Sequence, residues 1–446
     1  MRSIKSNLFY RNMITTSQVA QWRNRFQQNS NKKKFQNLIS DNKLSSLYTN
    51  RDQYQKHQHI FSHRVKPYLK VTAQKASGRC WLFAALNVIR RDMVKKYDIE
   101  NFEFSQSYLF FWDKLERINY GLSSIIKTKD YQLDSQLVQH LLTEPTCDGG
   151  QWDMVVNLVE KYGLVPKSVF RETHHSSNSR EMNIILTKKF REYAMQLRQS
   201  EDPESLKDQF MEEVYGMLCQ FLGTPPKTFD FEYLSKKDDQ YHLVENLTPL
   251  KFYQEYVDFN CEDYACVIHD PRTEHPYHQM YTVQFLGNVE GGHKVRYLNL
   301  PIEELQELVK QNIQDDQVVW FGCDVGKWLH QEECSMDLNL VDYSFLTNFN
   351  LNKEERLKYR DSLMTHAMVF TGANIRGDQV DKWQVENSWA TRDAAEGYYI
   401  MTNDWFNEYV YEVVVHKKYL EKYKSLLEGD QYVELKPWDP MGSLAK

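Results

Sequence analysis

The chain of 446 residues is 41% hydrophobic and 14% aromatic, so it is long enough for two or three sub-domains and too apolar to remain disordered. No apolar run approaches the roughly 18 residues that cross a bilayer, which excludes a membrane-embedded protein. The net charge is −6, and the seven cysteines are scattered with neither CxxC spacing nor a secretory segment before them. This cysteine usage favours the reducing cytoplasm and predicts neither disulfides nor a zinc site.

The N-terminal end of the chain differs in charge from the rest. Its first 40 residues contain eight lysines and arginines and no acidic residue, although the whole chain is acidic. A basic, amphipathic start of this kind is typical of organelle transit peptides, and equally of a solvated basic arm. We therefore predict an extension at 1–16 that is either a mitochondrial transit segment or such an arm.

Two helices are predicted in the next part of the chain, 17–165. The stretch QKASGRCWLFAALNVIRRDM begins with a polar turn and continues with apolar residues at helical spacing. An amphipathic helix is therefore expected to begin at Cys80 and to reach about residue 97. QWDMVVNLVEKYG follows a Gly-Gly pair and predicts a second helix that ends at Gly163. We interpret 17–165 as an N-terminal arm followed by a helical lobe.

Beyond residue 165 the pattern changes first to long polar helices and then to strands. We interpret 166–300 as a mainly helical insertion, 301–418 as an antiparallel β-barrel lobe, and 419–446 as a C-terminal helix and tail. The overall prediction is an α+β fold. Strands are expected in short runs bounded by Gly, Asn and Asp, namely YTVQFLG, QVVWFGCDV, AMVFTGANI, KWQVENSW, GYYIMT and YVYEVVVH.

Cys80 occupies a position that suits a nucleophile, although a cysteine is most often a small buried hydrophobe. At a helix N-terminus, unpaired backbone N–H groups and the helix dipole favour an anion and lower the pKa of a thiol. The flexible SGRC turn lets backbone approach a substrate. Gln74 supplies a donor that, together with the Cys80 N–H, can hold a developing oxyanion.

A thiolate nucleophile also needs a general base and a group that orients the base. His366 heads the strand predicted in MTHAMVF, and Asn387 ends the strand predicted in VENSW. Either residue taken alone is most simply a satisfied core or surface group. Together they form a functional pair, because the neutral Asn387 side chain can accept a hydrogen bond from the imidazole, and Trp389 can shield that bond from water.

The blocks Q…SGRCW, THA and ENSW, in this order, resemble the Gln, Cys, His and Asn blocks of papain-like cysteine peptidases. Cys80 and His366 are 286 residues apart, whereas the papain spacing is roughly 130 to 150, and the predicted insertion accounts for the difference. The branch with such an insertion is the bleomycin hydrolase family (peptidase C1B), which the chain resembles from about residue 17 to its end. Further similar blocks are EFSQSYLFFWDKLER, DGGQWDMVVNLVEKYGLVPK, HDPR, VWFGCDVGK, SLMTHAMVFT and PWDPMGSLAK.

The resemblance implies a papain-like fold with a helical lobe, an antiparallel β-barrel lobe and a large helical insertion. It implies four roles: Cys80 as nucleophile, His366 as general base and then acid, Asn387 as orienting group and Gln74 as oxyanion donor. It also implies that Gly149 and Gly150 line the substrate cleft, where backbone without side chains lets a peptide approach. Without the resemblance, this Gly-Gly pair is a simple loop before a helix.

The end of the chain carries the most specific implication of the resemblance. In this family the C-terminal arm lies in the active-site cleft, and its free carboxylate anchors the α-ammonium of the substrate. The small, apolar MGSLAK fits such an arm and makes Ala445 and Lys446 substrate-binding residues; the alternative is a frayed end with no role. Because the cationic Lys446 would repel an ammonium group, we expect the enzyme to remove Lys446 and leave Ala445 as the anchor.

The function implied by the resemblance is a cysteine-type aminopeptidase that hydrolyses N-terminal residues from peptides and small amides through an acyl-enzyme, with no cofactor. The family also implies a homohexamer with its active sites on an internal channel. The alternative is a hexameric channel protein that binds single-stranded nucleic acid weakly through the basic N-terminal residues, with peptidase activity secondary. A steep loss of nucleic-acid affinity with salt would indicate this alternative. A catalytically silent subunit is hard to reconcile with four intact site residues.

One loop departs from the family pattern. Papain relatives have NSWG, whereas Ala390 follows Trp389 in this chain. If the backbone at Ala390 has positive φ, its side chain costs about 1 kcal/mol or reshapes the loop. We expect altered detail near Asn387 with activity retained.

Overall fold

The computed structural model describes residues 13–54, 57–390 and 395–445. Two compact units are formed, one by Met1–His57 with Leu338–Asn350 and the other by Gln58–Asp337 with Leu351–Lys446. Two predicted features lie outside the described residues. They are most of the N-terminal extension, residues 1–12, and Lys446, which was predicted to bind substrate. All the other residues predicted to act in catalysis or substrate binding belong to the larger unit.

The smaller unit consists of short helices. These are α2 (Thr16–Gln28), α3 (Ser30–Asp41), η1 (Leu44–Ser46) and α4 (Arg51–Tyr54). Helix α2 begins with a capping box, in which Thr15 and Gln18 satisfy each other's backbone N–H. Neither α2 nor α3 buries a residue within the chain, and Trp22 is 49% exposed. These helices therefore present apolar side chains to their surroundings.

The larger unit contains the helices of both predicted lobes. Helix α5 begins at Cys80, and α8 ends at Gly163, whose φ of 68° only glycine adopts readily, as expected from the sequence. The bounds are α5 (Cys80–Tyr97), α6 (Gln106–Lys127), α7 (Gln136–Thr143), α8 (Trp152–Tyr162), α9 (His174–Ser177), α10 (Arg180–Gln199), α11 (Pro203–Leu222), α12 (Pro249–Tyr256), η2 (Cys261–Asp263), α13 (Ile302–Gln314), α14 (Lys353–Lys358), α15 (Asn403–Tyr409), η3 (Lys417–Tyr423), α16 (Lys424–Leu427) and η4 (Pro440–Ala445).

A mostly antiparallel sheet runs through the larger unit. Its strand order is β14-β5-β6-β4-β13-β7-β10-β11-β12-β9-β8, with β1 also paired to β10. A separate two-stranded sheet joins β2 and β3. The strands are β1 (His63–Arg64), β2 (Phe229–Leu234), β3 (Tyr241–Leu247), β4 (Tyr264–Ile268), β5 (Gln279–Val283), β6 (Arg296–Asn299), β7 (Val319–Cys323), β8 (Leu329–His330), β9 (Ser335–Met336), β10 (His366–Arg376), β11 (Gln379–Glu386), β12 (Tyr398–Thr402), β13 (Val410–His416) and β14 (Val433–Leu435).

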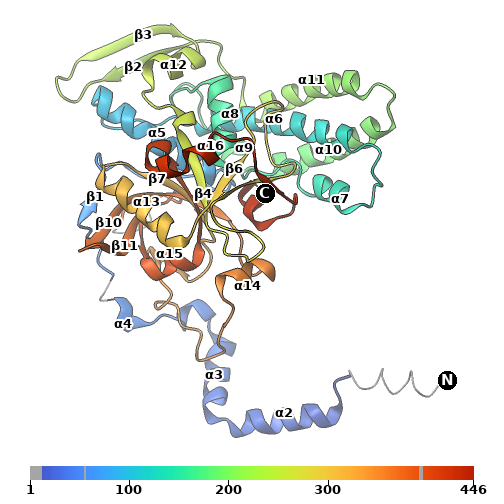
Figure 1. Cartoon of the computed structure of the whole chain (residues 1–446), viewed down its shortest axis with the longest axis vertical. Helices are drawn as coiled ribbons and strands as arrows, with labels where there is room; N and C mark the ends of the chain where they lie inside the picture. The colour runs from blue at the N-terminus through green and yellow to red at the C-terminus, as the bar shows by residue number, and fades with distance from the viewer. Residues whose placement is uncertain (1–12, 55–56, 391–394, 446) are drawn as a thin grey trace. The chain divides into compact units, whose positions relative to one another are not determined.

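The segment predicted as a mainly helical insertion, 166–300, contains both kinds of element. Helices α10 and α11 pack on each other and on α6, to one side of the sheet (Figure 1). The segment also contributes strands β2 to β6, of which β4, β5 and β6 join the main sheet. The periodicity of the polar helices therefore describes only the first part of the segment.

Helix α5 has the predicted bounds but not the predicted exposed face. An amphipathic helix would expose its charged residues, but Arg90 and Arg91 are buried. Their guanidinium groups bind the two carboxylate oxygens of Glu386, each at 2.7 Å, and this carboxylate is itself buried. Glu386 ends β11 and immediately precedes Asn387, so the pair of ion pairs ties the helix that begins at Cys80 to the strand that leads to Asn387.

We predict that Glu386→Gln lowers the free energy of unfolding by about 3 to 5 kcal/mol, because it leaves two buried guanidinium groups without a counter-charge. Urea denaturation measures the loss. The matched control is Glu290→Gln, which removes an exposed pair with Lys127 and should cost less than about 1 kcal/mol. Equal effects of the two substitutions would contradict a structural role for the buried pairs.

Candidate active site

The turn before Cys80 is fixed by a buried carboxylate. The N–H of Gly78 donates to Oδ2 of Asp148 at 2.9 Å, and Lys114 Nζ binds the other oxygen at 2.7 Å. A Cβ on Gly78 would lie only 2.7 Å from the Asp148 Cβ, so the turn needs glycine for this close approach. Pairing with Lys114 holds the pKa of Asp148 well below its ordinary value, although burial acts in the opposite direction.

A second ion pair fixes the residue directly before the nucleophile. Arg79, fully buried, binds Glu172 in a bidentate arrangement with distances of 3.0 and 2.8 Å. Its Nε also donates to the hydroxyl of Ser77 at 2.9 Å. The backbone on the N-terminal side of Cys80 is thus held at Gly78 and at Arg79, which fixes the start of α5.

His366 and Asn387 form the pair expected from the sequence. Nε2 of His366 lies 2.9 Å from Oδ1 of Asn387, and that oxygen also accepts the N–H of Ser388 at 2.7 Å. Because Oδ1 is an acceptor in both contacts, Nε2 of His366 donates, and Nδ1 of the neutral ring is free to take a proton. The Trp389 ring lies 4.8 Å from the imidazole, centroid to centroid, where it can shield this bond.

The thiol lies beside the start of the histidine strand. The Ala367 N–H, next to His366 in β10, interacts with the Cys80 sulfur. In the described part of the chain, the thiol makes no hydrogen bond with the imidazole. Burial raises the pKa of Cys80 to about 11, against the opposing effect of backbone N–H groups. Burial likewise lowers the pKa of His366 to about 4, although Asn387 opposes this.

The helix N-terminus acts on the Cys80 pKa in the predicted direction, but the net shift is upward because of burial. The loss of hydration outweighs the helix N–H groups at a thiol that is 5% exposed. Burial thus favours the uncharged form of each group, a thiol on Cys80 and a neutral imidazole on His366.

Gln74 is held against the loop that follows Asn387. Its backbone N–H donates to the Ser388 carbonyl at 2.9 Å, and Ala73 forms a bridge with Trp389. The side-chain Nε2 donates to the Ser77 carbonyl at 2.7 Å. One of its two amide hydrogens is thus committed, which leaves the second for a ligand.

Gly149 and Gly150 are constrained by packing. The Gly149 carbonyl accepts from Arg117 at 2.6 Å, and a Cβ on Gly150 would lie 2.5 Å from the Trp81 indole. Trp81 also donates from Nε1 to the Asp148 carbonyl at 2.7 Å. Packing alone thus requires glycine at 150, and the expected contact of both glycines with a peptide stays a prediction.

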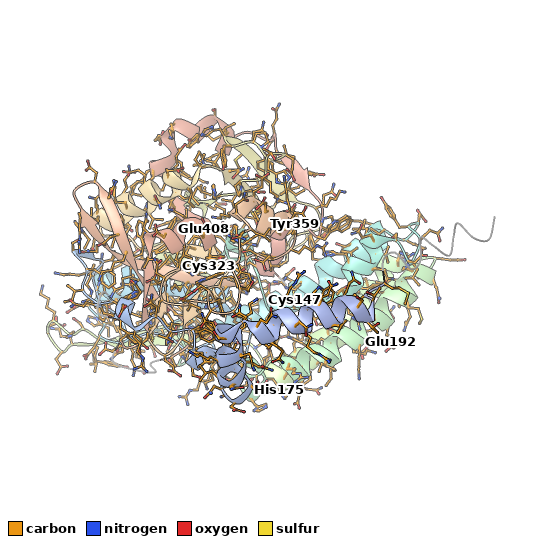
Figure 2. The ribbon with its side chains drawn as sticks, turned by 90° about the horizontal axis from the view of Figure 1, so that it is seen from below. Cys147, His175, Glu192, Cys323, Tyr359 and Glu408 are labelled. Carbon is orange, nitrogen blue, oxygen red and sulfur yellow. The ribbon has the colours of Figure 1, made fainter. Side chains whose placement is uncertain are left out.

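The C-terminal residues bridge segments from both halves of the site. Met441 to Ala445 are buried, so the described tail is not a frayed end. The Ser443 hydroxyl donates to the Met364 carbonyl at 2.8 Å, two residues before His366. The Cys147 thiol (labelled in Figure 2), two residues before Gly149, donates to the Ala445 carbonyl at 3.0 Å. A pocket of about 170 Å³ adjoins Ala445 and Cys147.

Ala390 has the positive φ that the sequence analysis considered for this position. Its φ is 70°, the left-handed region that costs a side chain roughly 1–2 kcal/mol. Gly397, which precedes β12, also has positive φ, and a Cβ there would lie 2.9 Å from the Ala390 carbonyl oxygen. The loop after Asn387 thus keeps the glycine-like conformation despite the alanine.

Outside this site, the described residues contain one cluster of side chains close enough together to bind a metal ion. Glu160, Glu262 and His293 each place a ligand atom within 4.8 Å of the others. His293 Nε2 lies 2.9 Å from Glu160 and 3.3 Å from Glu262. All three side chains are at least partly exposed, and the contacts of His293 with the two carboxylates account for the arrangement.

Several residues that shape the site were not identified from the sequence. They are Asp148, Arg79 with Glu172, Cys147, and Glu386 with its two arginines. Asp148 directly precedes the Gly-Gly pair, and Glu386 directly precedes the NSW block. This closeness to predicted site residues is the sequence signal that could have identified them. Their partners come from distant segments and carry no local pattern.

We predict that Asp148→Asn makes stability less dependent on pH in the acid range. The lowered pKa of Asp148 contributes stability that is fully present above the unfolded value of about 3.9 and is lost as pH falls through the folded value. The variant should therefore lose about 3 to 5 kcal/mol at pH 6 and progressively less toward pH 3, measured by urea denaturation. Asp258→Asn, at an exposed carboxylate, is the control. A difference that stays constant with pH would refute the assignment.

Comparison with known proteins gives matches over nearly the whole chain. Residues 13–442 match the model of the Peptidase C1-like family. The bleomycin hydrolase of Rattus norvegicus is 47% identical over 92% of this chain and 94% of its own. Aminopeptidase C of Listeria innocua is 41% identical over 97% of this chain and 99% of its own. The crystal structure of PepW from Lactobacillus rhamnosis superposes with a TM-score of 0.94 at 41% identity, over 97% of this chain and 99% of that one.

Proposed function

Since the chain belongs to the Peptidase C1-like family and is a cysteine aminopeptidase of bleomycin hydrolase type, we propose that Cys80, His366 and Asn387 perform its chemistry. The predicted α+β, papain-like fold is confirmed by the same family match and by the likeness to PepW. The hydrogen bond between His366 Nε2 and Asn387 Oδ1 is the observation that carries this assignment, because it leaves Nδ1 to act as the base.

In the proposed reaction, Nδ1 of His366 takes the Cys80 proton as the sulfur attacks the substrate carbonyl. The oxyanion that forms accepts hydrogen bonds from the Cys80 N–H and the second amide hydrogen of Gln74. When the intermediate collapses, the C–N bond breaks and the imidazolium gives its proton to the leaving amine. His366 then removes a proton from water, which attacks the acyl-enzyme and releases the acid and the thiol.

The tail supports cleavage from the N-terminus of the substrate. The Ala445 carbonyl accepts a hydrogen bond from Cys147, which precedes the Gly-Gly segment. Ser443 donates to Met364, which precedes the strand of His366. The end of the tail therefore contacts both segments. If Lys446 is removed, the carboxylate of Ala445 is positioned to bind the α-ammonium of a substrate. A peptide continuing past that point would collide with the tail, so only its first residue could reach Cys80.

We also propose a homohexamer in the cytoplasm. The unburied helices α2 and α3, with Trp22 exposed, are suited to contact other subunits. The seven cysteines are all free thiols, which fits a reducing compartment, whereas the basic start keeps the mitochondrion as the alternative. Among the described helices, none has both the length and the apolar character needed to cross a membrane.

The alternative of single-stranded nucleic-acid binding is not favoured. The net charge of −6 opposes contact with phosphates. The relatives named above are a bleomycin hydrolase and an aminopeptidase. Peptides and small amides are therefore the proposed substrates.

We predict that the protein hydrolyses fluorogenic aminoacyl amides with a free amino group, and that N-acetylation lowers kcat/KM by about tenfold to a hundredfold because the ammonium contact is lost. Cys80→Ala should reduce kcat by about 10⁴-fold or more. Cys219→Ala, in α11, is the matched control and should retain activity. Equal cleavage of acetylated substrates would remove the role of the tail but keep the catalytic residues. Cleavage that survives in Cys80→Ala would refute the nucleophile.

We predict that active enzyme lacks Lys446. We expect Cys80 to cleave the peptide bond between Ala445 and Lys446 at the end of its own chain. Intact-mass analysis should find the wild type lighter than Cys80→Ala by one lysine residue, after allowance for the substitution. Lys446 retained in both proteins would contradict self-processing.

A further inference from the structure

The segment that enters the site is held, before it reaches the site, by a cluster of charged residues. The cluster joins the HDPR block, at the end of β4, to the PWDP block of the tail. Its members are Asp270, Arg272, His275 and Asp439. None of them has a role in the reaction proposed above.

Arg272 is the centre of this cluster and is 8% exposed. Its NH1 and NH2 groups bind both carboxylate oxygens of Asp439, at 3.1 and 2.8 Å. Its Nε and NH2 also bind the two oxygens of Asp270, at 2.9 and 2.7 Å. One guanidinium therefore bridges two carboxylates with bidentate geometry on each side, the arrangement that lysine cannot reproduce.

The base of this clamp is built into the main sheet. Asp270 also contacts His275 Nδ1 at 2.6 Å, and its backbone N–H donates to Asn299 Oδ1 at 2.9 Å. Asn299 ends β6, which pairs with β4. From β4, paired strands β13, β7 and β10 lead without interruption to His366. The position of Arg272 relative to the imidazole is thus set by hydrogen-bonded strands.

Asp439 also organises the tail that follows it. Its Oδ1 accepts the Met441 N–H at 2.9 Å, and its carbonyl accepts the Gly442 N–H at 3.1 Å, so η4 starts from this residue. Beyond Asp439, the side-chain contacts of the tail are single neutral hydrogen bonds, from Tyr297, to Met364 and from Cys147. Among the described residues, the Arg272 contact is the one ion pair that holds the terminal turn.

We propose that the Arg272–Asp439 ion pair is a positioning clamp that fixes where the C-terminal end lies in the cleft, and so sets the preference for free N-termini. This rests on the proposed function of the tail. A fixed clamp followed by a short, tightly wound turn gives the last residue a defined reach. Without the clamp, the terminal turn can shift within the cleft or move out of it. An N-acetylated or longer substrate can then occupy the space that the turn filled.

The test is Asp439→Asn in the full chain, assayed with matched free-amine and N-acetylated aminoacyl amides. Asparagine keeps the Oδ1 acceptor for Met441 but removes the charge opposite Arg272. We expect the ratio of kcat/KM for free over acetylated substrate to fall by about tenfold or more, through a higher KM for the free amine and faster cleavage of the acetylated one. Asp439→Glu, which restores the charge, should recover part of the ratio.

Glu434→Gln is the matched control, because it removes an exposed carboxylate on β14 that accepts a hydrogen bond from Gln284. It should keep the wild-type ratio. Hydrogen exchange of peptides covering 436–446 provides a second measurement, and the amides of η4 should exchange faster in Asp439→Asn alone.

The outcomes separate this proposal from the function on which it rests. A wild-type ratio retained in Asp439→Asn, or equal losses for both substrates with unchanged exchange, would overturn the clamp while leaving the tail's role intact. A wild type that does not distinguish the two substrates would overturn the proposed role of the tail, and the specificity role of the clamp with it.

Discussion

The site depends first on Glu386, whose carboxylate lies between the guanidinium groups of Arg90 and Arg91. Buried charges lose hydration, and they persist only where partners compensate for it at short range. The two arginines belong to the helix that starts with Cys80, and Glu386 directly precedes Asn387. Any rotation of that helix against the sheet would separate buried opposite charges. Cys80 and Asn387 therefore keep one relative position.

The same burial that holds the framework also determines the protonation of the reacting groups. Loss of hydration moves the pKa of Cys80 up and that of His366 down, so neither ion is favoured by itself. In a low-dielectric surrounding, however, opposite charges formed together attract strongly. In the proposed mechanism the proton transfer therefore coincides with attack on a substrate, and the hydrogen bond to Asn387 fixes which ring nitrogen of His366 receives the proton.

The sequence alone was sufficient to predict much of the fold and of the candidate site. The start of α5 at Cys80, the end of α8 at Gly163, the strand that begins at His366 and the pairing of His366 with Asn387 all follow from periodicity, turn residues and neighbouring blocks. What the sequence did not provide depends on distant partners. Arg90 and Arg91 have the composition of a solvated face until Glu386 is placed opposite them, and the pKa of Cys80 depends on burial by elements far away in the chain.

The buried tail has a consequence for molecules designed against the site. In the proposed arrangement, the buried residues Met441 to Ala445 fill volume that a long peptide-like inhibitor would use on the side of the scissile bond toward its N-terminus. Such an inhibitor must first displace the chain's own end, which is tethered and present at a high effective concentration. Compact compounds that stop at the tail avoid that competition. Size, rather than sequence preference, would then distinguish inhibitors of this enzyme from those of relatives with an open cleft.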